Sequence, residues 1–154
     1  MSNPLHSPVK LAIIALVVVL LVLSWISLKP EPGTPEVVVE DTVRELVAAA
    51  EARNLKPFRH HLSENVKDGA DNSKKEILRL LQAIFLRNNT ISLTILGLTV
   101  EKDSNPEILH VTLVLLMGNT PIPEDKGTFE FTFRREGDWK VWEMKWQDGV
   151  QYGI

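Results

Sequence analysis

The chain has 154 residues, a net charge of −3, no cysteine and 44% hydrophobic residues. This length supports one domain with a single core, and the lack of cysteine excludes disulfide bonds and lipid attachment through a cysteine. Lys10 and Lys29 precede the acidic residues, so the rest of the chain is more acidic than the whole. An acidic domain is not expected to bind nucleic acid.

The stretch Leu11–Leu28 is uncharged and almost entirely apolar. As a helix it would be about 27 Å long, close to the ~30 Å hydrocarbon core of a bilayer. Trp25 near its end fits the preference of indole rings for the membrane interface. We therefore expect an uncleaved transmembrane helix, with the lipid bilayer as its partner, rather than a cleaved signal peptide, whose apolar region is usually shorter. A buried helix of a soluble domain is the other alternative.

The flanking charges suggest an orientation. Lys10 precedes the apolar stretch and several acidic residues follow it, which favours a cytoplasmic N-terminus and an exported C-terminal part. The predicted organisation is a cytoplasmic tail at 1–10, a transmembrane helix at 11–28, a proline-rich linker at 29–35 and an extracytoplasmic domain at 36–154. In a bacterium, the protein would be a single-pass protein of the inner membrane with a periplasmic domain.

Three helices are predicted at the start of this domain. Thr34 and Pro35 are typical of a helix start, and apolar residues recur at helical spacing from Val39 onward. A short second helix is expected from Pro57, and the polar stretch 63–72 is expected to be a loop. Ser73 begins a capping-box signature for the third helix.

From residue 90 the apolar period changes from 3.6 to 2, which indicates β-strands. The alternation changes phase at Gly97, which predicts a bulge. The stretch 108–117 is apolar on both parities and is expected to be covered on both faces. Two more strands, joined by a tight turn at Glu136–Gly137, complete the pattern. The predicted class is α+β, with three helices packed on one face of a bent four-stranded antiparallel sheet.

This order of elements, closed by Phe129–Phe133 and the segment Gly137-Asp-Trp-Lys-Val141, resembles the nuclear-transport-factor-two-like (SnoaL-like) superfamily over residues 36–147. The resemblance implies a cone with a pocket between helices and sheet, and contact between subunits through the outer sheet face. Its members include isomerases, dehydratases and non-catalytic domains. The stretch 63–72 is too short for the extra hairpin that many members have there, which implies a shallower or more open pocket.

His110 is the candidate ligand-binding residue. It has the strand parity of Ile108 and Thr112, and it would be either a polar group of a pocket or a hydrogen-bonded core histidine. The resemblance implies an active-site tyrosine with aspartates in isomerases, but Tyr152 is the one tyrosine here and lies near the C-terminus. Without a recognisable catalytic set or metal-ligand spacing, we expect no enzymatic activity, no metal and no cofactor.

Trp142, Met144 and Trp146 share one strand parity, whereas Trp139 and Val141 have the other. If the first set faces outward, it forms an exposed apolar patch of the kind that marks a protein interface. The alternative is a bulge near Trp142 that turns both sets toward one core.

These observations favour a membrane-anchored protein whose extracytoplasmic domain is a non-catalytic protein-interaction or assembly module. Its expected partner is another protein or a second copy of the chain, bound through the outer sheet face. The alternative is a pocket domain that binds or turns over a small apolar ligand, as an isomerase or dehydratase would, with His110 as its polar group.

Overall fold

The computed structural model describes residues 17–18, 33–118 and 125–148. Pro35–Ile154 form one compact unit. Its elements are α2 (Pro35–Glu51), α3 (Lys56–His61), β1 (Leu62–Asp68), α4 (Lys74–Arg87), β2 (Ser92–Lys102), β3 (Ile108–Gly118), β4 (Asp125–Glu136) and β5 (Asp138–Asp148). The predicted transmembrane helix Leu11–Leu28 lies outside the described residues except for Val17 and Val18. Within the described ranges, no helix combines the length and apolar character needed to cross a bilayer.

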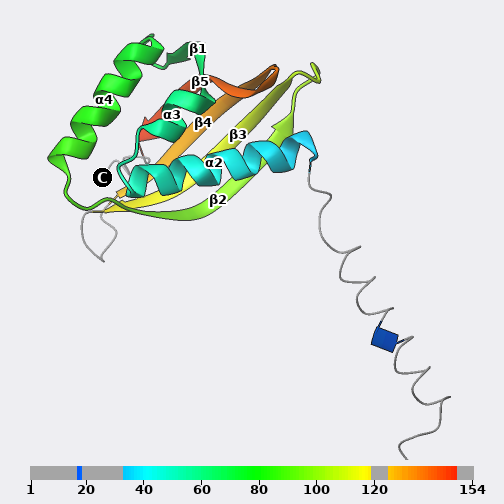
Figure 1. The fold of residues 1–154 in the computed structure, drawn as a ribbon, viewed down its shortest axis with the longest axis horizontal. Helices are drawn as coiled ribbons and strands as arrows, with labels where there is room; N and C mark the ends of the chain where they lie inside the picture. Colours follow the sequence, from blue (N-terminus) through cyan, green and yellow to red (C-terminus); the bar gives the residue numbers. More distant parts are fainter. Residues whose placement is uncertain (1–16, 19–32, 119–124, 149–154) are drawn as a thin grey trace, which may run out of the picture. The chain divides into compact units, whose positions relative to one another are not determined.

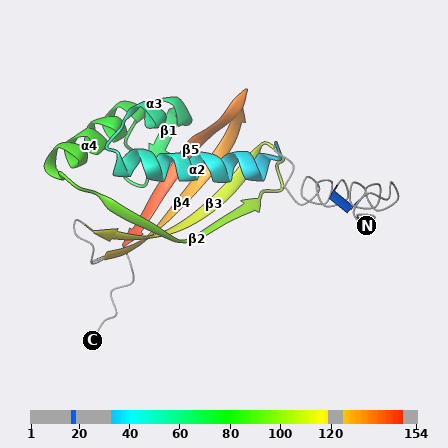
Figure 2. The same cartoon turned by 60° about the horizontal axis from the view of Figure 1, so that its bottom comes forward.

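The strands form one mixed five-stranded sheet with the order β1-β5-β4-β3-β2. Strands β2 to β5 are an antiparallel meander, and β1 lies parallel to β5 at one edge. Helices α2 and α3 lie over one face of the curved sheet, and α4 lies beside them (Figures 1 and 2). The α+β class is therefore confirmed, whereas the prediction of four antiparallel strands is wrong.

The missed strand is β1, which occupies most of the stretch predicted to be a loop. Its sequence is polar except for Leu62 and Val66, which are buried together with Ser63. The Ser63 hydroxyl donates a hydrogen bond to Glu136 Oε1 at 3.0 Å. The pairing with β5 is parallel, remote in sequence and irregular between Leu62 and Lys67. No local alternation of apolar residues therefore indicated this strand.

The predicted helices are present, and the reasons given for them hold. One stripe of α2 is buried, including Val39 and Val43. Helix α4 follows Ser73, whose backbone N–H donates to Glu76 Oε2 at 2.7 Å, as the capping-box signature predicts. The tight turn between β4 and β5 is also confirmed, with Gly137 at a φ of +79°, where a side chain would be strained.

Two bulges shape the sheet. The pairing of β2 with β3 shifts between Ile95 and Gly97 and leaves Leu96 unpaired and exposed, which confirms the predicted phase change. The pairing of β4 with β5 shifts between Thr132 and Phe133 and leaves Trp142 unpaired. After each bulge the alternation restarts, so residues of both parities along the strand face the helices.

The core lies between α2 and the inner face of the sheet, which is the face toward the helices. The side chains of Val39, Val111, Phe133 and Val141 are at most 1% exposed. Strand β3 is covered on this face alone. Its outward-facing residues, which include His110, remain partly or fully exposed. The prediction that this strand is covered on both faces is therefore wrong.

Candidate ligand-binding cavity

A cavity of about 970 Å³ lies between the helices and the inner face of the sheet. Its volume falls within the range of roughly 300–1,000 Å³ that is usual for small-molecule sites. Most of its lining is apolar. The helices contribute Val43, Leu46, Val47, Ala50, Phe58, Leu81, Ile84 and Phe85, and the sheet contributes Leu93, Leu113, Leu115, Met117, Phe129, Phe131, Val141, Met144 and Trp146.

One side of the cavity is an aromatic wall, formed by Phe129, Phe131, Met144 and Trp146. Phe129 is paired with Trp146 across β4 and β5, and Phe131 is paired with Met144. The rings of Phe129 and Trp146 are nearly parallel, with an angle of 3° and centroids 5.8 Å apart. The rings of Phe129 and Phe131 are also nearly parallel, at 9° and 6.4 Å. The pairing of the two strands thus places three parallel rings along one wall.

Gly127 makes room for this wall. A Cβ atom at this position would lie 2.9 Å from both the Cε of Met117 and the Nε1 of Trp146, and 3.3 Å from the Phe129 ring. Carbon atoms do not tolerate such distances without displacement. The absence of a side chain at Gly127 therefore lets the Trp146 indole lie close to the β4 backbone.

Hydrogen bonds hold the helices that cover the cavity. The Glu51 carboxylate, at the end of α2, accepts the backbone N–H of Leu93 at 3.0 Å and so joins α2 to β2. At the end of α4, the Asn88 side-chain amide donates to the Ile84 carbonyl at 2.8 Å. The first contact fixes α2, which lines the cavity, to the sheet, and the second caps the C-terminal end of α4.

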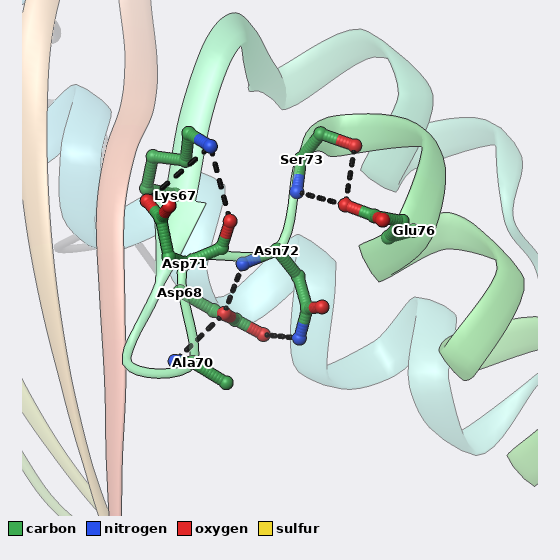
Figure 3. Close-up of polar contacts among 7 residues, drawn as sticks. All are labelled: Lys67, Asp68, Ala70, Asp71, Asn72, Ser73 and Glu76. Atoms are coloured by element: carbon green, nitrogen blue, oxygen red, sulfur yellow. Dashed lines mark hydrogen bonds and ion pairs between the residues drawn. The ribbon is translucent and has the colours of Figure 1, made fainter.

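The start of α4 is held by the turn that follows β1 (Figure 3). The Asp68 carboxylate accepts the backbone N–H groups of Ala70 and Asn72 and the Asn72 side-chain amide, at 2.8–2.9 Å. Burial alone would raise the pKa of Asp68, but these hydrogen bonds lower it overall. The Ser73 N–H and hydroxyl donate to Glu76 and lower the pKa of that carboxyl. The ionised Asp68 thus stabilises the turn before α4, and the ionised Glu76 stabilises the first turn of the helix.

Polar groups gather at one end of the cavity. Ser92 is paired with Gly118 at the ends of β2 and β3, and Asp125 is paired with Met117 at the start of β4. Ser92, Asp125 and Lys126 all contribute to the lining there. Asp125 has the parity of Gly127 and is the one carboxylate among the described lining residues. It can accept a hydrogen bond from a bound molecule.

His110 lies on the opposite face of the sheet and does not reach the cavity. Its Nε2 lies 2.8 Å from Asp103 Oδ2, and its Nδ1 lies 3.4 Å from Thr132 Oγ1. The Asn105 N–H, followed by the His110 ring, lowers the pKa of Asp103. His110 is exposed rather than buried, so the structure places it neither in a pocket nor in the core. The two sequence-based alternatives for this residue are both wrong.

The three residues predicted as a protein interface do not share one face. Trp142 points outward, where the Arg134 guanidinium carbon lies 4.6 Å from its ring centroid. Met144 and Trp146 face the cavity, as does Val141 before the bulge. The predicted bulge near Trp142 is present, but it turns Met144 and Trp146 inward and leaves Trp142 on the outer face. Binding of another protein or a second copy through the outer sheet face stays a prediction.

The described part of the chain has no group of three or more His, Asp or Glu side chains arranged to hold a metal ion. The cavity lining itself supplies one carboxylate and one ammonium group as charged contacts. Its described chemistry therefore suits an uncharged or weakly polar organic molecule better than an ion.

No protein-family model matches the sequence, and no curated protein matches it. Solved structures do match. An NTF2-like protein of unknown function from Pseudomonas putida is 12% identical, with a TM-score of 0.65 over 76% of this chain and 88% of that chain. A protein from Streptomyces avermitilis, proposed to be a dehydratase of the NTF2-like family, is 16% identical, with a TM-score of 0.59 over 75% and 96%. The domain has the NTF2-like fold. The resemblance seen in the sequence is confirmed at this level.

A proposed ketosteroid isomerase from Shewanella frigidimarina is also similar, with 16% identity and a TM-score of 0.57 over 70% of this chain and 92% of that chain. The names of the dehydratase and the isomerase contradict our expectation that the domain is not an enzyme. That expectation treated the lack of a recognisable catalytic set as evidence against activity, although one fold can host many different active sites. Identities this low show the fold of this chain and nothing finer.

Proposed function

We propose that the domain binds a small, largely apolar organic molecule in the cavity between its helices and its sheet. The observation that carries this proposal is the 970 Å³ cavity with its apolar lining. An apolar surface of this kind, left uncovered by the protein itself, favours a ligand that removes it from water. The similarity in fold to a proposed dehydratase and a proposed isomerase supports a pocket domain over an assembly module.

Calorimetric titration with 2-tetralone, a small bicyclic ketone, tests this proposal on the full-length chain. Ala50 lines the cavity from α2, so Ala50→Trp would fill part of it. Ala48 is exposed on the same helix, so Ala48→Trp is the matched control. We expect one binding site in the wild type and the control, and at least tenfold weaker binding in Ala50→Trp. Equal binding by all three proteins would place the ligand elsewhere and contradict the proposal.

Proton transfer is the second candidate function, and the position of Asp125 favours it. A carboxylate on the inner parity of β4, at the polar end of an apolar cavity, can remove a proton from the carbon next to a carbonyl group. Isomerases that act through an enolate, and dehydratases that eliminate water beside a carbonyl group, use such a step. Hydrogen–deuterium exchange at C1 of 2-tetralone, followed by NMR in D₂O, measures it directly.

We expect Asp125→Asn to abolish exchange above the uncatalysed rate while 2-tetralone still binds. Asp138 is exposed at the start of β5, so Asp138→Asn is the matched control and should exchange normally. If the wild-type protein binds the ketone without accelerating exchange, proton transfer is excluded and ligand binding remains.

Anchoring by Leu11–Leu28, with an extracytoplasmic domain, remains a proposal from the sequence. It is supported by the length and apolar character of that stretch. Alkaline extraction of membranes, combined with protease treatment of spheroplasts, would test it. Release of the chain from the membrane by alkali would contradict the anchor, and protection of the domain in spheroplasts would contradict the orientation.

A further inference from the structure

We propose that the ligand of this cavity is a planar aromatic ring system, bound against the aromatic wall with Trp146 as the residue that selects it. This inference rests on the proposed function and specifies the class of ligand. It concerns the half of the cavity formed by β4 and β5, where Phe129 and Trp146 lie side by side.

The geometry of Trp146 is the first argument. Its indole is bordered by the parallel Phe129 ring and by the backbone at Gly127, yet its side chain is 59% exposed. A tryptophan that serves only the core would be largely covered, as Trp139 on the same strand is, at 8%. The rest of the Trp146 ring is therefore free to contact a ligand.

The parallel arrangement of the wall is the second argument. Aromatic rings prefer offset parallel or edge-to-face contacts with centroids about 4.5–7 Å apart. The plane of the Phe129 ring differs by 3° from that of the Trp146 indole and by 9° from that of the Phe131 ring. A planar ligand that lies parallel to these rings can therefore extend the stacked series. A puckered saturated ring has no flat face and cannot stack in this way.

The distribution of residue types around the cavity is the third argument. Its β2 and β3 side is aliphatic, with Leu93, Leu113 and Leu115, and would accept any apolar group. The β4 and β5 side is aromatic and is bordered by Met117 and Met144. Thioether groups make favourable contacts with the edges of aromatic rings and adapt to their shape. The aromatic part of the ligand therefore lies toward β4 and β5.

The experiment compares two probes of the same skeleton, 2-naphthol and trans-decahydro-2-naphthol, by calorimetric titration of the full-length chain. The saturated probe is the more apolar, so binding driven by area alone would favour it. Stacking against the aromatic wall should instead make 2-naphthol bind about tenfold more tightly.

Three variants locate this preference. Trp146→Leu keeps an apolar side chain and should abolish the preference for 2-naphthol while leaving the saturated probe bound. Gly127→Ala should weaken the preference, because the new Cβ displaces the indole. Trp142→Leu is the matched control on the outer face and should keep the preference unchanged.

The outcomes separate this inference from the proposed function. Equal affinities for the two probes in the wild type, or a preference that survives Trp146→Leu, would overturn the aromatic ligand and leave an apolar site in place. Failure of both probes to bind would overturn the proposed function itself. A preference lost in Trp146→Leu and kept in Trp142→Leu establishes the inference, whether or not Gly127→Ala folds.

Discussion

The two ends of the inner face of the sheet differ although they are built from the same types of residue. Strand β5 carries a tryptophan toward the helices at each end, and Trp139 is 8% exposed whereas Trp146 is 59% exposed. Near Trp139, the side chains of Phe133 and Val141 are completely buried. Near Trp146, Phe129 remains partly exposed around the cavity.

This difference separates stability from function. At the packed end, apolar burial contributes roughly 25 cal/mol for each Å² removed from water. At the open end the chain leaves apolar surface uncovered and forgoes that contribution. The bulge at Trp142 lies between the two ends and turns residues of both parities inward. One strand can therefore supply the core with Val141 and the cavity with Met144.

The largest expected effect is on stability, and it compares the same substitution, phenylalanine to alanine, at the packed end and at the open end. Phe133→Ala removes a fully buried ring and should lower the free energy of unfolding by about 3–5 kcal/mol. Phe129→Ala removes a ring that already borders the cavity and should lower it by ~1–2 kcal/mol. Urea unfolding followed by circular dichroism measures both. Equal losses would contradict the division into a packed end and an open end.

A smaller effect concerns α4, which covers the open end. Ser73→Ala removes the hydroxyl of the helix N-cap and should lower the free energy of unfolding by about 1 kcal/mol. Ser104→Ala, in an exposed loop, is the control and should change it by less than about 0.5 kcal/mol. A loss that is the same in both variants would show that the cap does not hold α4.

The stability of α4 should depend on pH, because ionised carboxylates hold both its cap and the turn before it. The pKa values of Asp68 and Glu76 are lower in the folded protein than in the unfolded chain, so the folded state binds fewer protons. The stabilisation is complete above the unfolded pKa values, about 4, and is lost as the pH falls through the lower folded values. The urea concentration at the unfolding midpoint of the wild type should therefore decrease as the pH is lowered from 5 to 3. The decrease should be smaller in Glu76→Gln. An unchanged midpoint would contradict this role of the two carboxylates.

The smallest expected effect is on the outer face. Trp142→Leu removes the contact with the Arg134 guanidinium, which is worth about 0.5–1 kcal/mol at an exposed site. It should leave the binding of 2-tetralone unchanged, because Trp142 does not line the cavity. A tenfold loss of binding would show that the two faces are coupled.

Local patterns predicted the parts of this fold that depend on neighbouring residues. The capping box at Ser73, the phase change at Gly97 and the turn at Gly137 each depend on a few consecutive side chains. The helical stripe of α2 is equally local. Such features are fixed by backbone conformation and by the period of apolar residues, both of which can be read directly from the sequence.

The features that the sequence analysis missed, or left open, depend on distant pairing. Strand β1 is polar and exists because Leu62 and Val66 can be buried beside β5, more than 70 residues away. Met144 and Trp146 face inward because the register of β4 and β5 shifts between Thr132 and Phe133. Gly127, next to the phenylalanines of β4, was the one local signal of a close approach at the cavity. It was not used.

The most direct test of the cavity uses the three methionines of the chain. Met117 and Met144 line the cavity, whereas Met1 belongs to the other unit of the chain. The full-length protein is labelled with ¹³C at the methionine methyl groups and titrated with 2-naphthol. We predict that the Met117 and Met144 signals shift together with one dissociation constant. Unchanged Met117 and Met144 signals at saturating 2-naphthol would contradict a ligand site between the helices and the sheet.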